Sequence, residues 1–247
     1  MRFAFRVWPP GTALRRWRRS PLPYGLWLAL AASVIWFPAA ACAQATVGGR
    51  ITILERDGER TSDLANAVVY LAPADREARA GSPVTVPIAM ESRQFVPRIR
   101  VVPVGSTVEF PNHDPFRHNV FSKSGPNEFD LGLYGRGDSR GAPLRRAGVF
   151  PIFCNIHARM VAFAIAIPTP WFAQAGADGR FEIAGVPPGR YTLHAWHDRG
   201  GTGERLVTVP AEGIADLAIE LDARGYEVVQ HRNKFGQEYT TTGRDRY

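Results

Sequence analysis

The chain after residue 45 is divided into short apolar runs by frequent turn signals, and no helix-period segment of useful length occurs in it. The 24 Gly and 20 Pro residues of the whole chain supply many of the turns, and β-branched and aromatic residues fill the runs between them. The predicted strands are 49–54, 67–71, 84–90, 98–104, 107–110, 118–121, 148–153, 162–167, 180–183, 190–195, 205–209 and 216–221. Many short strands at this spacing predict an all-β fold built from sandwiches or barrels.

Two stretches lack a strand signal. Residues 124–146 are rich in Gly and Arg, so we expect a long loop there. Residues 223–247 form a polar C-terminal tail that we expect to be loosely packed, and His231 within it carries no functional signal.

The first 45 residues have the composition of an export signal. They contain six arginines and no acidic residue, followed by an apolar run at 25–37 that is too short to span a bilayer comfortably. Small residues at A-x-A spacing then predict cleavage of the signal peptide near Ala43 or Ala45. The alternatives are a retained anchor, a twin-arginine signal, or lipid attachment through Cys42. We expect a periplasmic protein with no transmembrane segment in its mature chain.

Charge and cysteine content both change when this leader is removed. The whole chain has 30 Lys+Arg and 23 Asp+Glu, so losing six arginines leaves 24 against 23, a net charge of +1. A nucleic-acid partner therefore loses its electrostatic support. Cys154 becomes the only cysteine of the mature chain. It must be a buried inert residue, an intermolecular bridge, a nucleophile or a metal ligand.

Cys154 begins a segment in which His157 and Met160 follow at intervals of three residues. A thiolate, an imidazole and a thioether form a soft ligand set that selects copper, and a trigonal His₂Cys site with a weak axial Met is typical of blue-copper centres. A second histidine is needed, and His118 at the start of a predicted strand is the candidate. The alternatives are a structural cysteine with an incidental His and Met, or a Cys–His nucleophile.

The remaining histidines have weaker signals. His113 is expected to be an exposed loop residue, with an additional ligand or a proton-linked group as the alternative. His194 and His197 lie three apart in a predicted strand and so face opposite sides, which disfavours joint metal binding.

Residues 84–167 resemble a cupredoxin of the plastocyanin/amicyanin type. The resemblance is carried by Phe95-x-Pro97, the run from Val104 to Asn112, His118-Asn119-Val120, Gly148-x-Phe150 and Cys154-x-x-His157-x-x-Met160. It implies a Greek-key β-sandwich with one type 1 copper, held by His118, Cys154, His157 and Met160. It further implies that His157 is the exposed ligand, and that Asn119 behind the ligands ties their loops together.

Residues 178–196 form a predicted hairpin around Pro187-Pro188-Gly189 that resembles the carboxypeptidase regulatory-like (transthyretin-like) β-sandwich. The opening strands of such a module lie upstream, at 49–53 and 66–71. We therefore expect a signal peptide at 1–45, the two parts of this module at 46–82 and 168–222, the cupredoxin domain inserted between them at 83–167, and the tail at 223–247. Consecutive small β domains are the alternative. Insertion requires strand 49–54 or 66–71 to pair with the 180–221 sheet.

The expected function is that of an exported electron carrier, not an enzyme. Its partners would be redox proteins such as cytochromes or an oxidase or dehydrogenase. The alternatives are copper storage, delivery or sensing without electron transfer, and a non-catalytic binding module that has lost its metal. A multicopper oxidase would need His-x-His pairs, and the sequence contains none.

Overall fold

The computed structural model describes residues 44–228 and 230–239. The predicted signal peptide up to residue 43, including Cys42, lies outside the described residues. Within the described part, the structure is almost entirely β, with two short 3₁₀ turns at Leu64–Asn66 and Gly125–Asn127. The prediction of an all-β fold is confirmed. No helix in this part of the chain is long and apolar enough to cross a membrane.

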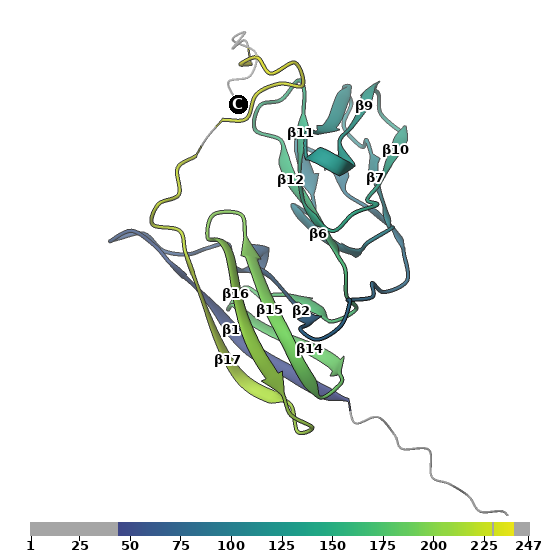
Figure 1. Ribbon diagram of the computed structural model, residues 1–247. Coiled ribbons are helices and arrows are strands. Elements are labelled where there is room, and N and C mark those ends of the chain that lie inside the picture. Colours follow the sequence, from purple (N-terminus) through teal and green to yellow (C-terminus); the bar gives the residue numbers. More distant parts are fainter. Residues whose placement is uncertain (1–43, 229, 240–247) are drawn as a thin grey trace, which may run out of the picture. The chain divides into compact units, whose positions relative to one another are not determined.

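One sandwich is built from two sheets of widely separated segments (Figure 1). The first sheet has the order β14 (Arg180–Val186), β1 (Ala45–Leu54) and β17 (Ile214–Asp222), and the second has the order β13 (Phe172–Gln174), β2 (Val68–Pro73), β15 (Gly189–His197) and β16 (Gly201–Val209). Inward side chains of both sheets, among them Ile51, Leu71, Ile183 and Tyr191, form one buried core. β1 and β2 therefore pair with strands that follow residue 171, as an inserted middle segment requires.

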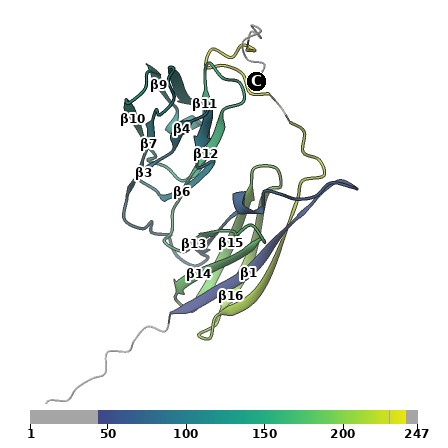
Figure 2. The same cartoon turned by 180° about the vertical axis from the view of Figure 1, so that it is seen from behind.

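The middle segment forms a second sandwich (Figure 2). Its larger sheet has the order β6 (Ile99–Pro103), β12 (Val161–Ile167), β11 (Gly148–Cys154), β8 (His118–Ser122) and β9 (Phe129–Tyr134). The facing sheet has the order β10 (Ser139–Pro143), β7 (Thr107–Pro111) and β3 (Thr85–Pro87), and the hairpin β4 (Ala89–Glu91) and β5 (Gln94–Val96) lies beside them. Phe110, Val120 and Ile152 belong to the core that the two sheets share.

The expectation of a loop at 124–146 is wrong, because this stretch contains β9 and β10. Both strands lie at sheet edges and expose many of their side chains, so they lack an alternating apolar pattern. Gly132 (φ +69°) lies inside β9 and Gly137 (φ +86°) in the connecting turn, where their left-handed backbone suits glycine. The glycines that indicated a loop are parts of a strand and its turn.

The predicted strand 84–90 is divided at Ile88. β3 pairs in parallel with β7, whereas β4 pairs with β5 in a hairpin, so the chain changes partner between them. The short strands β5 and β13 were also not predicted.

The prediction of a loosely packed tail is wrong for residues 230–239. These residues contact the second sandwich through hydrogen bonds, an ion pair and ring stacking. The contacts converge on the end of β11, where Cys154 lies.

Candidate metal centre

The site lies where two paired strands and one loop meet. Alternation along β11 turns Phe150, Ile152 and Cys154 into the core. Pairing of β11 with β8 sets Cys154 opposite Val120, two residues after His118. The loop that follows Cys154 returns His157 to the same place. The structure thus brings together three of the four predicted ligands.

The three donor atoms form a compact triangle. Cys154 Sγ lies 3.6 Å from Nδ1 of His118 and 3.6 Å from Nδ1 of His157, and the two nitrogens are 3.1 Å apart. The point equidistant from these atoms lies about 2.0 Å from each, close to the metal–nitrogen and metal–sulfur bond lengths of about 2.0–2.3 Å known for zinc. The residues therefore fit a single ion bound by two imidazoles and one thiolate.

Met160 closes the ligand loop. Its N–H donates to the carbonyl of His157 at 3.0 Å, and its own carbonyl accepts the N–H of Cys154 at 3.3 Å. The side chain is buried in the same apolar cluster as Cys154. Because the loop is short and closed at both ends, His157 and Met160 are held near the thiol, but the role of Met160 as an axial ligand stays a prediction.

The surroundings of Cys154 favour a protonated thiol until a metal binds. Burial raises the pKa of the Cys154 thiol, while the backbone N–H groups of Ile156, Asn119 and His157 act in the opposite direction. Donors aimed at the sulfur stabilise a thiolate once it forms. A metal that binds here must therefore displace the thiol proton.

His118 is fully buried and is oriented by a carboxylate. Its Nε2 lies 2.9 Å from Asp114 Oδ2, which leaves Nδ1 facing the other two donors. Burial lowers the pKa of His118, although Asp114 opposes this, so the ring is neutral and able to bind a metal. A carboxylate on the outer nitrogen is the usual support of a metal-bound histidine.

Sequence reasoning missed Asp114. Burial would raise the pKa of Asp114, but hydrogen bonds from the backbone N–H of Arg93, from His118 and from the backbone N–H of Ser92 outweigh burial and lower it. The two backbone bonds are 2.7 Å long for Ser92 and 2.9 Å for Arg93. The available signal was a carboxylate four residues before the candidate ligand, in a short polar turn.

Asn119 connects the ligand strands through its backbone. Its carbonyl accepts the N–H of Asn155 at 3.1 Å, directly after Cys154. Its side chain instead donates to Asp130 on β9 at 2.6 Å. The expected link between ligand loops is thus made by the main chain, while the side chain joins β8 to the sheet edge.

The C-terminal tail covers the thiol-bearing strand end, which sequence reasoning also missed. The Tyr239 hydroxyl donates to the carbonyl of Cys154 at 2.7 Å, and the ring of His231 stacks on Phe153 with centroids 4.2 Å apart. Lys234 forms an ion pair with Asp130 at 2.7 Å. His231 therefore has a structural contact beside the site, contrary to the expectation from its polar surroundings.

The other histidines lie away from this site. His113 is exposed, as predicted, and its Nδ1 lies 2.8 Å from Glu91. His194 stacks on Tyr70, whereas His197 is buried and its Nδ1 accepts the N–H groups of Arg199 and Gly200.

His197 also lies near Asp63 and Asp198, a second group with metal-ligand chemistry. Both carboxylate oxygens of Asp63 accept hydrogen bonds from Arg199, at 2.7 and 2.8 Å. The guanidinium already supplies the positive charge there, so this group is explained by an internal ion-pair network.

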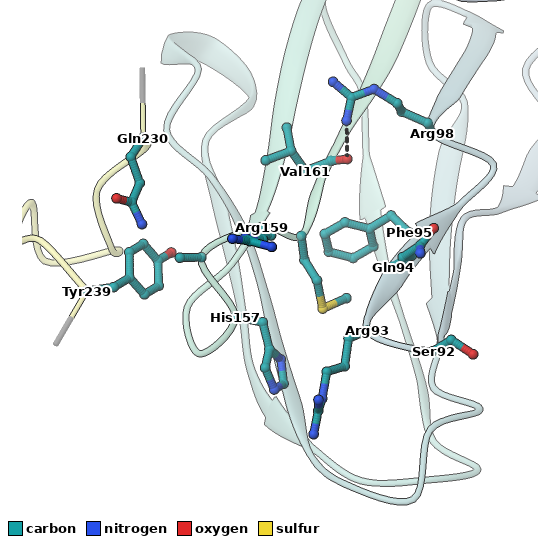
Figure 3. Close-up of a pocket in the computed structure, with 12 residues that line it drawn as sticks. Ser92, Arg93, Gln94, Phe95, Arg98, His157, Arg159, Val161, Gln230 and Tyr239 are labelled. Carbon is teal, nitrogen blue, oxygen red and sulfur yellow. Dashed lines mark hydrogen bonds between the residues drawn. The ribbon is translucent and has the colours of Figure 1, made fainter. Parts of the chain in front are cut away.

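A groove of about 680 Å³ opens beside His157 (Figure 3). We call it the arginine groove. It is lined by Ser92, Arg93, Gln94, Phe95, Arg98, His157, Ala158, Arg159, Met160, Val161, Gln230 and Tyr239. His157 is partly exposed, so one predicted ligand lies at the protein surface while His118 and Cys154 are buried.

Comparisons with known proteins give partial likenesses. No family model and no curated protein matches the sequence. A purple cupredoxin from Nitrosopumilus maritimus is 21% identical over 33% of this chain and 99% of its own, with a TM-score of 0.30. Amicyanin from Paracoccus versutus is 24% identical over 40% of this chain and 91% of its own, with a TM-score of 0.31.

A copper-containing nitrite reductase from Thermus scotoductus is 23% identical over 47% of this chain and 28% of its own, with a TM-score of 0.32. These likenesses cover less than half of this chain.

Proposed function

We propose that this protein is an exported type 1 copper protein that carries single electrons between redox partner proteins. The observation that carries the proposal is the triangle of donor atoms from His118, Cys154 and His157. Copper in such a site supplies the chemistry by alternating between Cu(I) and Cu(II). The proposed role is that of a carrier and not of a catalyst.

The chain's own residues suit this role because they restrict movement and exclude water. His118 and Cys154 lie on paired strands of one sheet, and Asp114 fixes the ring of His118. The ring of Phe116 packs edge-on against both histidines, with centroids 5.2 Å from His118 and 5.6 Å from His157. A site held in this way changes little when its charge changes, which favours fast electron transfer.

The domain plan is part of the same proposal. The cupredoxin domain would occupy residues 83–167, with Met160 as the axial ligand. The surrounding sandwich of residues 46–82 and 168–222 would be a regulatory-like module, which the pairing of β1 with β14 and β17 supports. Export to the periplasm, with a signal peptide cleaved near Ala43 or Ala45, rests on the sequence of the leader.

The test is the visible absorption of the purified mature chain loaded with Cu(II). We expect an intense blue thiolate-to-copper band at one copper per chain, which Cys154→Ser removes and His113→Ala retains. A colourless protein with stoichiometric copper would overturn the type 1 assignment. Cyclic voltammetry then separates the roles: a reversible one-electron wave supports a carrier, and copper release on reduction supports storage or delivery.

A further inference from the structure

We propose that the arginine groove is the docking site for an acidic segment of the redox partner protein. This inference rests on the electron-carrier function proposed above and names the chemistry of the partner. The groove lies beside His157, the predicted ligand nearest the surface. A partner seated there would lie next to the point where electrons leave or enter.

The groove is lined by more cationic than anionic side chains. Three of its lining residues are arginines, and none of the twelve described lining residues carries a carboxylate. Arg98 forms an ion pair with Asp198 at 2.6 Å, whereas no ion pair occurs for Arg93 or Arg159 among the described residues. The chain after residue 45 has a net charge of only +1, so this positive patch is local. Such patches steer and orient partners of opposite charge.

Arg93 and His157 both contact the ring of Phe116. Its guanidinium is 5.0 Å from the ring centroid of Phe116, and the ring of His157 packs edge-on against Phe116. Figure 3 shows that Arg93 and His157 come from different segments that border one groove. A carboxylate bound by Arg93 would therefore bring its own chain into contact with His157.

The turn that presents Arg93 is held in an unfavourable backbone conformation. Ser92 (φ +52°) and Arg93 (φ +59°) both adopt the left-handed region, which residues other than Gly, Asn and Asp rarely occupy. The carboxylate of Asp114 accepts both of their backbone N–H groups and so stabilises the turn. Strain that the surrounding structure maintains is typical of functional positions. The same Asp114 orients His118, so one residue positions both the docking arginine and a ligand.

The shape and lining of the groove favour a protein segment over a small anion. Ala158 and Val161 are partly exposed apolar side chains that line it, and the buried side chains of Phe95 and Met160 also border it. A free inorganic anion gains nothing from apolar surface, whereas a peptide can place an apolar side chain there while its carboxylates pair with the arginines. The volume of about 680 Å³ also exceeds what one small anion fills.

The test measures binding of a fluorescein-labelled peptide, acetyl-Glu-Glu-Phe-Glu-Glu, by anisotropy at low ionic strength, with the mature chain in copper-loaded and copper-free forms. We compare wild type, the double variant Arg93→Gln/Arg159→Gln, and the matched control Arg190→Gln/Arg205→Gln, which changes two exposed arginines of the other sandwich. Losing two exposed ion pairs should weaken binding roughly two- to thirtyfold. The control should change it by less than about twofold.

Three results would overturn the proposal. The first is that the groove variant binds the peptide as tightly as wild type does. The second is that wild type binds the lysine counterpart of the peptide as tightly as the glutamate peptide. The third is that sulfate displaces the peptide much more strongly than chloride at equal ionic strength, which would indicate a site for small anions. The blue band is measured on the same samples. A blue protein that does not bind the peptide contradicts only the docking site, and a colourless protein that binds it contradicts the electron-carrier function.

Discussion

The carboxylate of Asp114 and the ring of His118 form a buried hydrogen-bonded pair, with Asp114 Oδ2 2.9 Å from His118 Nε2. The pair leaves Nδ1 of His118 facing the thiol of Cys154. An ionised carboxylate on Nε2 makes Nδ1 a stronger metal ligand. Three residues lie between Asp114 and His118 in the sequence, and the polar turn between β7 and β8 folds back to join the two side chains.

Asp114→Asn should therefore weaken copper binding. The expected loss is about 10–100-fold in Cu(II) affinity, measured by competition with a chelator. Each tenfold loss confined to Cu(II) raises the reduction potential by about 59 mV, which voltammetry detects. Asp75→Asn, an exposed change in the other sandwich, is the control. Unaltered affinity and potential in Asp114→Asn would show that the carboxylate only supports the turn.

Copper binding should depend on pH because the Cys154 thiol must lose its proton. Burial raises the pKa of Cys154, so the thiol is protonated at neutral pH, and each unit of falling pH should reduce the apparent affinity about tenfold. Isothermal titration in buffers of different ionisation enthalpy would count one proton released per copper. In Cys154→Ser the slope should disappear. An affinity that is constant between about pH 6 and 8 would indicate a preformed thiolate.

Tyr239→Phe should loosen the tail from the site. The lost hydrogen bond to the carbonyl of Cys154 should lower the free energy of unfolding by about 1 kcal/mol and speed the release of copper to a chelator. Tyr226→Phe, also in the chain after β17, is the matched control, and it should release copper at the wild-type rate. Identical release rates in all three proteins would mean that the tail does not protect the ligand.

Arg199 should stabilise the protein in a pH-dependent way. It donates to both Glu55 and Asp63, and these hydrogen bonds lower the pKa of each carboxyl. Because the folded-state pKa values are depressed, the stabilisation is present above the ordinary carboxyl pKa values and is lost as the pH falls through the lowered ones.

Arg199→Met should lower the free energy of unfolding by roughly 2–4 kcal/mol near pH 7, because it leaves two partly buried carboxylates without their partner. Urea denaturation at pH 7 and at about pH 3 measures this. The difference from wild type should shrink at the lower pH. If Arg199→Met lowered the free energy of unfolding by the same amount at pH 7 and at about pH 3, the loss would come from packing and not from the carboxylates.

The sequence predicted the parts of the site that depend on short spacing. Cys154 and His157 are close along the chain, and alternation along a strand turns Cys154 into the core. Asp114 is only four residues before His118, but a polar turn has no periodic pattern that shows which residue its side chain contacts. His231 and Tyr239 could not be found from spacing, because their roles depend on tertiary contacts of a polar tail. For the fold, the missed strands are short or lie at sheet edges: β5 and β13 have three residues each, and β9 and β10 lie at edges and expose many of their side chains.

The order in which the chain is made has a consequence for the site. All predicted ligands precede residue 161, but the residues that cover the end of β11 come at 231–239, and β1 must wait for β14 and β17 to pair. A growing chain thus contains all the predicted ligands before it contains the residues that cover the end of β11. A chain that ended before residue 231 would keep every predicted ligand but would lack the contacts of His231 and Tyr239 beside Cys154.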